Sequence, residues 1–211
     1  MTVKKSLFGA SLVLVCLVSV ACSSEKGGTA TPAQTGTSSS ASSADPNVPK
    51  VSVPLDVSKF ESNPCQIVSK DVLSSLQYTD PGKYYPRDDK VADRKAGPSC
   101  AWTLRGEGVS LQVVIGAGNR DRGTGGLAGL YAAHENGTLL KFLEPAPDVE
   151  GYPAIYLDTS DRRPQGNCGL QIGVADDLAI DVATEGYQGK SDSCGAAQQV
   201  AAAIVKTLKG A

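Results

Sequence analysis

The single histidine, His134, and two pairs of adjacent carboxylates are the side chains that could support acid–base chemistry in this chain. No nucleophile motif such as G-x-S-x-G accompanies His134, which lies at the edge of a helical apolar stripe, so we expect a partly buried structural histidine. Adjacent carboxylates point in different directions, and we place Asp88-Asp89 in a loop and Asp176-Asp177 in a turn. A glycosidase uses two carboxylates from separate elements, so a hydrolase built on such a pair stays open.

A glycine-rich stretch at residues 123–128, GTGGLA, matches the G-x-G-x-x-A pattern of dinucleotide-binding loops. That fingerprint must follow its strand directly, so that the pyrophosphate meets the helix N-terminus. Here residues 116–122 intervene, and nucleotides are scarce outside the cell. We expect a flexible loop and no cofactor.

Cys22 stands at the end of a segment with the marks of an export signal. Lys4 and Lys5 precede an apolar run of fifteen residues, 7–21, which is shorter than the ~20 residues that span a bilayer. Such a run is typical of a secretory signal peptide. Residues 19–23, SVACS, resemble a bacterial lipobox, in which the chain is cut before a diacylated cysteine; Ala21 fits that pattern, whereas Ser19 replaces the usual Leu. We expect a lipoprotein signal peptide at 1–21 and lipidation of Cys22, with ordinary secretion as the alternative.

The residues after Cys22 have the composition of a tether. Of the 27 residues from 23 to 49, 21 are Ser, Thr, Gly, Ala or Pro. Such a segment buries too little apolar surface to offset its ordering entropy. We expect a disordered tether over 22–54, which holds one globular domain, 55–211, off the extracytoplasmic face of the cell membrane through the diacylglyceryl group on Cys22.

Four further cysteines are Cys65, Cys100, Cys168 and Cys194, separated by 35, 68 and 26 residues. An even count in an exported chain favours disulfides. Structural zinc and redox sites use closely spaced CxxC pairs, and this chain has none. Four cysteines permit three pairings, of which we favour the sequential one, Cys65–Cys100 and Cys168–Cys194. No metal or cofactor is expected.

Composition excludes one further class of function. The chain has 211 residues, of which 41% are hydrophobic and 5% aromatic, and its formal net charge is −2. A nucleic-acid binder needs a clustered basic excess. We therefore expect no nucleic-acid partner.

The elements that must position these residues follow from hydrophobic periodicity. Short apolar–polar alternation predicts strands at 100–104, 109–115, 139–143 and 153–158, and a hairpin with strands near 170–174 and 178–182. Helical spacing predicts a short helix after Ser69, a second near 126–135 and a third from about Ser193 to Leu208. Hairpins without regular βαβ alternation favour an α+β fold, a mainly antiparallel sheet covered by helices.

A polar loop of about twenty residues between the first helix and the first strand carries Tyr78, Tyr84, Tyr85 and Arg87. Loops of this length without structure of their own are uncommon unless they are functional or disordered. Exposed tyrosines beside arginine suit a recognition surface. We therefore take Tyr84, Tyr85 and Arg87 as candidate recognition residues; the alternative is that the tyrosines only pin the loop to the sheet.

Short motifs in a fixed order carry a family resemblance: residues 63–68, NPCQIV; 100–102, CAW; 168–170, CGL; and 194–197, CGAA. Behind a lipobox and a Ser/Thr-rich tether, they resemble the actinobacterial lipoprotein family catalogued as domain of unknown function 3558, over residues 64–208. Asn63 stands where that family more often has Asp. The resemblance implies membrane anchoring and the sequential disulfides, and it brings no catalytic residues.

These observations favour a non-enzymatic, membrane-anchored extracytoplasmic lipoprotein that binds a ligand or a protein partner at the cell envelope. The alternatives are an envelope hydrolase using carboxylates that cannot be paired from sequence, and a structural or assembly lipoprotein.

Overall fold

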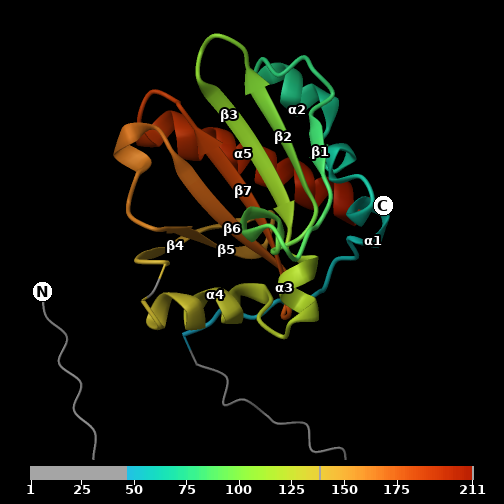
Figure 1. Ribbon diagram of the computed structural model, residues 1–211, viewed down its shortest axis with the longest axis vertical. Coiled ribbons are helices and arrows are strands. Elements are labelled where there is room, and N and C mark those ends of the chain that lie inside the picture. Colours follow the sequence, from blue (N-terminus) through green and yellow to red (C-terminus); the bar gives the residue numbers. More distant parts are fainter. Residues whose placement is uncertain (1–46, 138, 211) are drawn as a thin grey trace, which may run out of the picture. The chain divides into compact units, whose positions relative to one another are not determined.

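The computed structural model describes residues 47–137 and 139–210, drawn in colour in Figure 1. The predicted signal peptide, Cys22 and the tether up to residue 46 lie outside the described residues. The helical elements are α1 (Ser58–Glu61), η1 (Pro64–Gln66), α2 (Lys70–Ser75), η2 (Ala92–Arg94), α3 (Ala117–Asp121), α4 (Gly126–Glu135), η3 (Arg163–Gln165) and α5 (Lys190–Lys209). The strands are β1 (Lys83–Tyr85), β2 (Ser99–Leu104), β3 (Val109–Ile115), β4 (Phe142–Val149), β5 (Tyr152–Asp158), β6 (Cys168–Ala175) and β7 (Leu178–Glu185).

One seven-stranded sheet organises the domain, in the order β1-β2-β3-β7-β6-β5-β4, with every neighbouring pair antiparallel. The chain folds as two hairpin-built halves that meet where β3 pairs with β7. This confirms the expected α+β class. The antiparallel sheet also excludes a dinucleotide-binding loop at residues 123–128, because such a loop requires a parallel βαβ unit.

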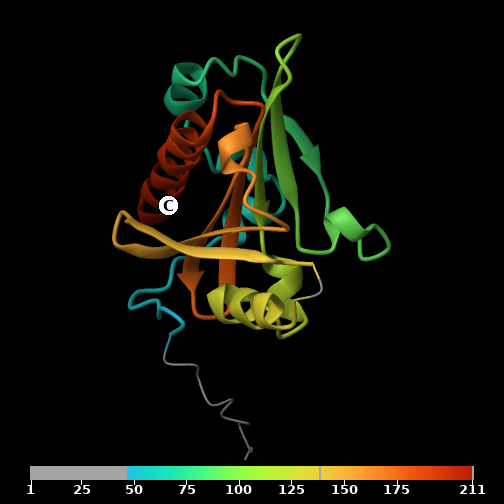
Figure 2. The same ribbon diagram turned by 90° about the vertical axis from the view of Figure 1, so that its left-hand side faces the viewer.

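The main core lies between the sheet and α5 (Figures 1 and 2). Alternate residues of β6 and β7 point toward it, so that Leu170, Ile172, Ile180 and Val182 are all fully buried. The predicted helix stripe is confirmed: Ala197, Val200, Ala201 and Ile204 are fully buried and Leu208 nearly so. The helix begins at Lys190, three residues before the predicted start, directly after Gly189, whose φ is +89°.

A smaller core lies on the opposite face, where α4 covers part of β5–β7. Leu127 packs there with Ile155, Leu157 and Ala179. The glycine-rich stretch links α3, which periodicity missed, to α4. At Gly126 an added Cβ would lie 2.0 Å from the Asp176 carbonyl oxygen of the β6–β7 turn, so glycine permits the close approach of α4 to this turn.

The domain begins earlier than the predicted boundary at residue 55, because residues 47–54 lie against it. Val48 packs into the smaller core. The Val51 N–H donates to the Asp176 carboxylate at 3.1 Å, and the Tyr152 hydroxyl donates to the Val53 carbonyl at 2.9 Å. The average composition of the Ser/Thr-rich segment did not predict this docking, because it gave little weight to the few valines whose apolar surface packs against the domain.

Two further boundaries differ from expectation. The strand predicted at 139–143 is β4, which starts at Phe142 and continues through Pro145 and Pro147 to Val149. Proline is tolerated there because β4 is an edge strand, so that a missing N–H faces no neighbour. The predicted twenty-residue loop contains β1 and η2. None of the described helices is long and apolar enough to cross a membrane.

Candidate binding grooves

The three candidate recognition residues separate in the structure. Tyr84 is 42% exposed on the edge strand β1. Tyr85, the next residue, points to the other face of the strand and is half-buried, with the Lys83 Nζ 4.9 Å from its ring centroid. Arg87 is held by carboxylates: its Nε donates to Asp89 Oδ1 at 3.1 Å, and its Nη1 donates to Asp121. Tyr84 lines a groove.

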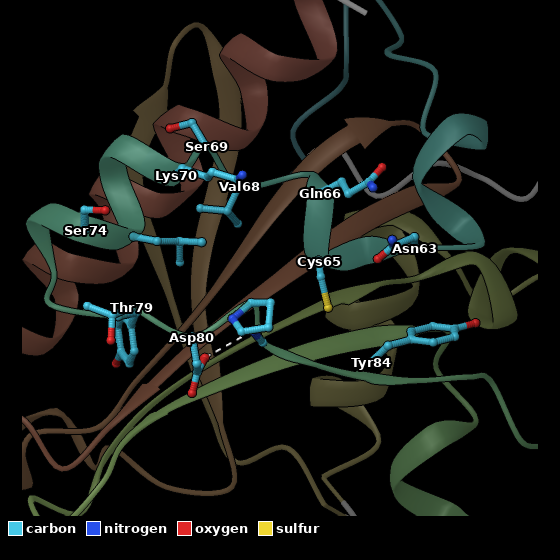
Figure 3. A pocket seen from close by; sticks show the side chains of 14 residues that line it. Asn63, Cys65, Gln66, Val68, Ser69, Lys70, Ser74, Thr79, Asp80 and Tyr84 are labelled. Carbon is cyan, nitrogen blue, oxygen red and sulfur yellow. Dashed lines mark hydrogen bonds between the residues drawn. The ribbon is translucent and has the colours of Figure 1, made fainter.

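That groove, which we call the edge groove, has a volume of about 1040 Å³ (Figure 3). Its walls are the η1–α2 segment on one side and residues 78–84 on the other. It is lined by Asn63, Cys65, Gln66, Val68, Ser69, Lys70, Leu73, Ser74, Tyr78, Thr79, Asp80, Pro81, Gly82 and Tyr84.

The first disulfide forms the base of the edge groove. Cys65 of η1 and Cys100 of β2 are joined with their Cα atoms 5.0 Å apart. An added Cβ at Gly82, where φ is +79°, would lie 2.5 Å from the Trp102 Nε1 and 2.6 Å from the Cys100 sulfur. Gly82 is therefore required for the groove wall to close over the buried indole and disulfide. Trp102, which is 1% exposed, therefore packs beside the disulfide on the inner face of the sheet.

The edge groove is nearly neutral, and its lining mixes polar groups with apolar side chains such as Val68, Leu73 and Pro81. Its charged side chains are Lys70 and Asp80, both exposed and of opposite sign. Its other polar groups are amides and hydroxyls, which both donate and accept hydrogen bonds. Ser69 takes the N-cap position of α2, but its hydroxyl makes no capping hydrogen bond, contrary to the predicted cap. Such a lining suits an uncharged polar ligand.

Tyr78 does not belong to an exposed tyrosine surface. It is 2% exposed, and its hydroxyl lies 3.0 Å from the Tyr187 hydroxyl. Burial, together with this hydrogen bond, raises the pKa of Tyr78 well above its ordinary value. Tyr78 therefore agrees with the alternative hypothesis for the loop tyrosines, in which they hold the loop against the domain.

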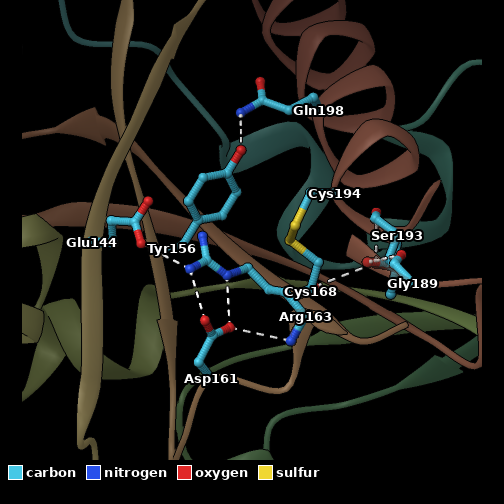
Figure 4. The surroundings of a disulfide bond; sticks show 10 residues. Glu144, Tyr156, Asp161, Arg163, Cys168, Gly189, Ser193, Cys194 and Gln198 are labelled. Atoms are coloured by element: carbon cyan, nitrogen blue, oxygen red, sulfur yellow. Dashed lines mark hydrogen bonds and ion pairs between the residues drawn. A yellow bond between two sulfur atoms is a disulfide. The ribbon is translucent and has the colours of Figure 1, made fainter. Parts of the chain in front are cut away.

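The second disulfide, Cys168–Cys194, joins β6 to α5 with Cα atoms 5.2 Å apart (Figure 4). Both pairs follow the sequential order that we favoured. Cys168 and Cys194 are buried in the main core. This disulfide fixes the helix to the sheet.

Arg163 lies near this disulfide (Figure 4) and is only 4% exposed. Its Nε and Nη2 donate to the two Asp161 carboxylate oxygens at 2.7 and 2.9 Å, and Nη2 also donates to Glu144 Oε2 at 2.8 Å. The guanidinium carbon lies 4.5 Å from the Phe142 ring centroid and 5.1 Å from that of Tyr156. These bonds, above all those to Asp161, raise the pKa of Arg163 and keep it charged. We call this cluster the arginine brace.

Asp181 lies on the face of the sheet that α5 leaves uncovered. It lies in the middle of the central strand β7, and it accepts a hydrogen bond from the Gln171 side-chain amide on β6. Burial raises the pKa of Asp181 to about 7, with a further contribution from the negative charge of Asp158. Asp158 itself pairs with Arg162, whose Nε donates to it at 2.9 Å. The structure thus brings together two carboxylates that sequence reasoning did not pair.

The other candidate residues have structural positions. His134 is half-buried in the last turn of α4, as expected. Asp88 lies in a loop, and Asp176-Asp177 form the β6–β7 turn. Asp89 binds Arg87, which lowers the pKa of the Asp89 carboxyl. Within residues 47–137 and 139–210, no three His, Cys, Asp or Glu side chains come together as a metal site.

Comparison with known families identifies the chain. A family model described as "Protein of unknown function (DUF3558)" matches residues 17–207. The chain belongs to this family. The match covers every described strand of the DUF3558 domain and both disulfides. No curated protein and no solved structure matches the chain.

Two charged residues of the DUF3558 domain were missed in the sequence, the buried Arg163 and the half-buried Asp181. Asp181 gave a signal, because an acid in the middle of the apolar strand LAIDV is unusual. Its side chain alternates away from the buried residues Ile180 and Val182, which marked the open face of the sheet as polar. Arg163 gave no such signal in the sequence. Its partners come from β4 and from the loop before η3, and only folding brings these two segments together.

Proposed function

We propose that this protein is an extracytoplasmic lipoprotein, anchored in the cell membrane through diacylated Cys22, and that it binds a ligand without enzymatic turnover. The edge groove is the observation that carries the proposal: a hollow of about 1040 Å³ with an exposed tyrosine at its rim. A groove of this size is in the range of ligand-binding clefts. The lipobox-like sequence and the Ser/Thr-rich segment support the anchor.

The chemistry of the lining favours an uncharged ligand rich in hydroxyl and amide groups. The Asn63 and Gln66 amides and the Ser69 and Ser74 hydroxyls lie along the η1–α2 wall of the groove, and the Thr79 hydroxyl lies on the opposite wall (Figure 3). Sugar hydroxyls and N-acetyl groups also both donate and accept hydrogen bonds, and Tyr84 offers a ring on which a sugar face can stack. An oligosaccharide of amino sugars fits these requirements.

Ligand binding is tested with N-acetylated chitotetraose as the probe. Titration calorimetry with the full chain should show saturable binding. Ser74→Trp places a bulky ring in the groove from the exposed face of α2 and should weaken binding at least tenfold, whereas Thr103→Trp, exposed on β2 outside the groove, should leave it unchanged. No saturable binding, or equal binding by Ser74→Trp, would contradict the proposed ligand class.

Anchoring is tested separately, in a bacterium that processes lipoproteins. Cys22→Ala should move the protein from the membrane fraction to the soluble extracytoplasmic fraction, because it removes the acceptor of the lipid. Cys16→Ala, in the same apolar segment, is the matched control and should stay in the membrane. Membrane retention of Cys22→Ala would show that something other than this lipid holds the protein.

The pair Asp158 and Asp181 raises the hydrolase alternative, but its contacts favour a binding role. Both oxygens of Asp158 are engaged, one by Arg162 and the other by the Thr159 N–H and hydroxyl. A carboxylate held in this way is poorly placed to act as a base or nucleophile.

A further inference from the structure

Two adjoining hollows lie on the sheet face opposite α5, away from the edge groove. Their volumes are about 460 and 240 Å³. Both are lined by Leu140, Leu157, Gln171 and Asp181. These four residues therefore form the boundary where the hollows meet, and we call the two hollows together the sheet-face site.

The larger hollow is mainly apolar. Its apolar lining comes from β3, β5, β7, α4 and the segment before β4: Val114, Leu130, Leu139, Leu140, Leu157 and Ala179. Leu139 is 73% exposed, although large apolar side chains are usually buried. This hollow can bury the apolar body of a ligand without any rearrangement of the sheet.

The charges that line the sheet-face site are strongly unbalanced. The acids are Asp93 of η2, Asp158 of β5, and Asp181 and Glu185 of β7. Among the described lining residues Arg162 is the one cation, so the formal charge of the site is −3. Arg162 is already engaged, since its Nε lies 2.9 Å from Asp158 and its Nη2 lies 3.8 Å from Glu185.

Asp181 is the acid that this arrangement leaves incomplete. Within the described residues it has no ion pair, and its hydrogen bond comes from the neutral Gln171 amide. Asp181 is half-buried, and a partly desolvated carboxylate is stabilised when a cation comes into contact with it. The structure supplies such a cation to Asp158 but not to Asp181.

We propose that the sheet-face site binds a small organic cation, a protonated amine with an apolar body, with the amine against Asp181 and the body in the larger hollow against Leu139, Leu140 and Leu157. This site is independent of the edge groove and of its proposed ligand. Because the amine prefers ionised Asp181, binding weakens as pH falls below the pKa of that carboxyl. The charged groups that face Asp181 are Asp158, Arg162, Asp93 and Glu185; the lining residues contributed by β3, α3 and α4 are uncharged.

The probe is dansylcadaverine, which carries a primary amine on an apolar fluorescent body, and binding is measured by fluorescence titration of the full chain. If only ionised Asp181 binds, a pKa of about 7 makes binding about 30-fold weaker at pH 5.5 than at pH 8. The amine itself stays protonated over this range, since its ordinary pKa is about 10. Dansylamide, which lacks the amine, should bind at least tenfold more weakly at pH 8 and show no pH dependence.

Two variants separate the charge from the apolar hollow. Asp181→Asn keeps the shape of the side chain and should lose at least tenfold in affinity at pH 8 together with the pH dependence. Asp71→Asn, on the exposed face of α2, is the matched control and should bind as the wild type does. Leu139→Ala should lose several-fold in affinity and keep the pH dependence, and its exposure means that folding is not at risk.

Three results would overturn the proposal: equal binding by Asp181→Asn, tighter binding at pH 5.5 than at pH 8, or equal binding of dansylamide. Tighter binding at low pH would instead assign to protonated Asp181 the role of a hydrogen-bond donor to an acceptor on the ligand. Equal binding by Leu139→Ala would contradict the placement of the apolar body.

Discussion

The arginine brace and the sheet-face site each keep an ionisable side chain away from water, but they complete its interactions to different degrees. Arg163 has two carboxylate partners and two aromatic rings, all within the domain. Asp181 has one neutral amide partner and faces a hollow. The Arg163 Nη1 is buried without a hydrogen-bond partner, but two carboxylates balance the charge of the guanidinium, whereas no cation within the described residues pairs with Asp181.

This difference separates structure from function within one small domain. The brace ties β4, the loop before η3 and the aromatic residues of β4 and β5 into one unit beside the Cys168–Cys194 disulfide. The sheet-face site leaves its central acid with a pKa near neutrality, where a ligand or a pH change can alter its charge. Binding chemistry is therefore expected where the domain has left a buried group incomplete.

The largest effect should come from removing the disulfide beside the brace. The Cys168→Ala/Cys194→Ala double variant opens a loop of 26 residues and should lower the free energy of unfolding by about 3.5 kcal/mol, because the unfolded chain regains that freedom. Urea unfolding measures the change.

Removing Cys65–Cys100, across 35 residues, should lower the free energy of unfolding by a similar amount and should also abolish probe binding in the edge groove. If chitotetraose bound equally well without Cys65–Cys100, the disulfide would not be the base of that groove.

Arg163→Ala should lower the free energy of unfolding by about 3 kcal/mol, since it leaves Asp161 and Glu144 without their cation and opens space between two rings. Chemical denaturation provides the measurement. The neighbouring Arg162→Ala is the matched control, because Arg162 is 44% exposed and its loss should cost less than about 1 kcal/mol. Equal losses for the two variants would show that the brace is no more than a surface ion pair.

The pH dependence of stability should report Asp181. Its pKa is raised from 3.8 to about 7 on folding, so the native state favours the protonated acid. This contribution is fully present below pH 4 and is lost as pH rises through 7; between pH 5 and pH 8 it should fall by about 2–3 kcal/mol. Urea unfolding of the wild type and of Asp181→Asn measures it. The difference between the two proteins should grow with pH, and parallel curves would contradict the assignment.

The smallest effect should come from the exposed rim of the brace. Glu144 is 48% exposed, and Glu144→Gln keeps a hydrogen-bond acceptor for Arg163, so the free energy of unfolding should fall by less than about 1 kcal/mol. Thermal unfolding at low and high salt checks this result. A loss as large as that of Arg163→Ala would mean that Glu144, rather than Asp161, provides most of the compensation for the buried guanidinium.

Much of the fold could be predicted because the patterns that encode it are local. Strict alternation in residues 109–115 and in the 170–182 hairpin gave strands in their correct positions, and the stripe from Ala197 to Leu208 gave α5. The elements that were missed, β1, α1, α3 and the three 3-10 helices, are three to five residues long, too short for a period to be recognised.

The candidate site could be predicted less well. The loop with Tyr84 was recognised from its length and composition, but its tyrosines have three different environments. Tyr78 is buried against Tyr187, 109 residues away, and Tyr84 and Tyr85 point to opposite faces of an unforeseen strand. Local sequence contains no information on which distant residue will cover a side chain.

The sequence by itself determined the antiparallel α+β class, the apolar faces of the strands and of α5, and the cysteines available for pairing, because each depends on residue type and short-range spacing. The tertiary structure decided which polar groups became buried and which of them found partners. Arg163 meets Glu144 from β4, whereas Asp181, between Val114 of β3 and Gln171 of β6, meets no cation within the described residues. The free energy of a charge depends on everything that surrounds it, and those surroundings exist only after distant segments have packed together.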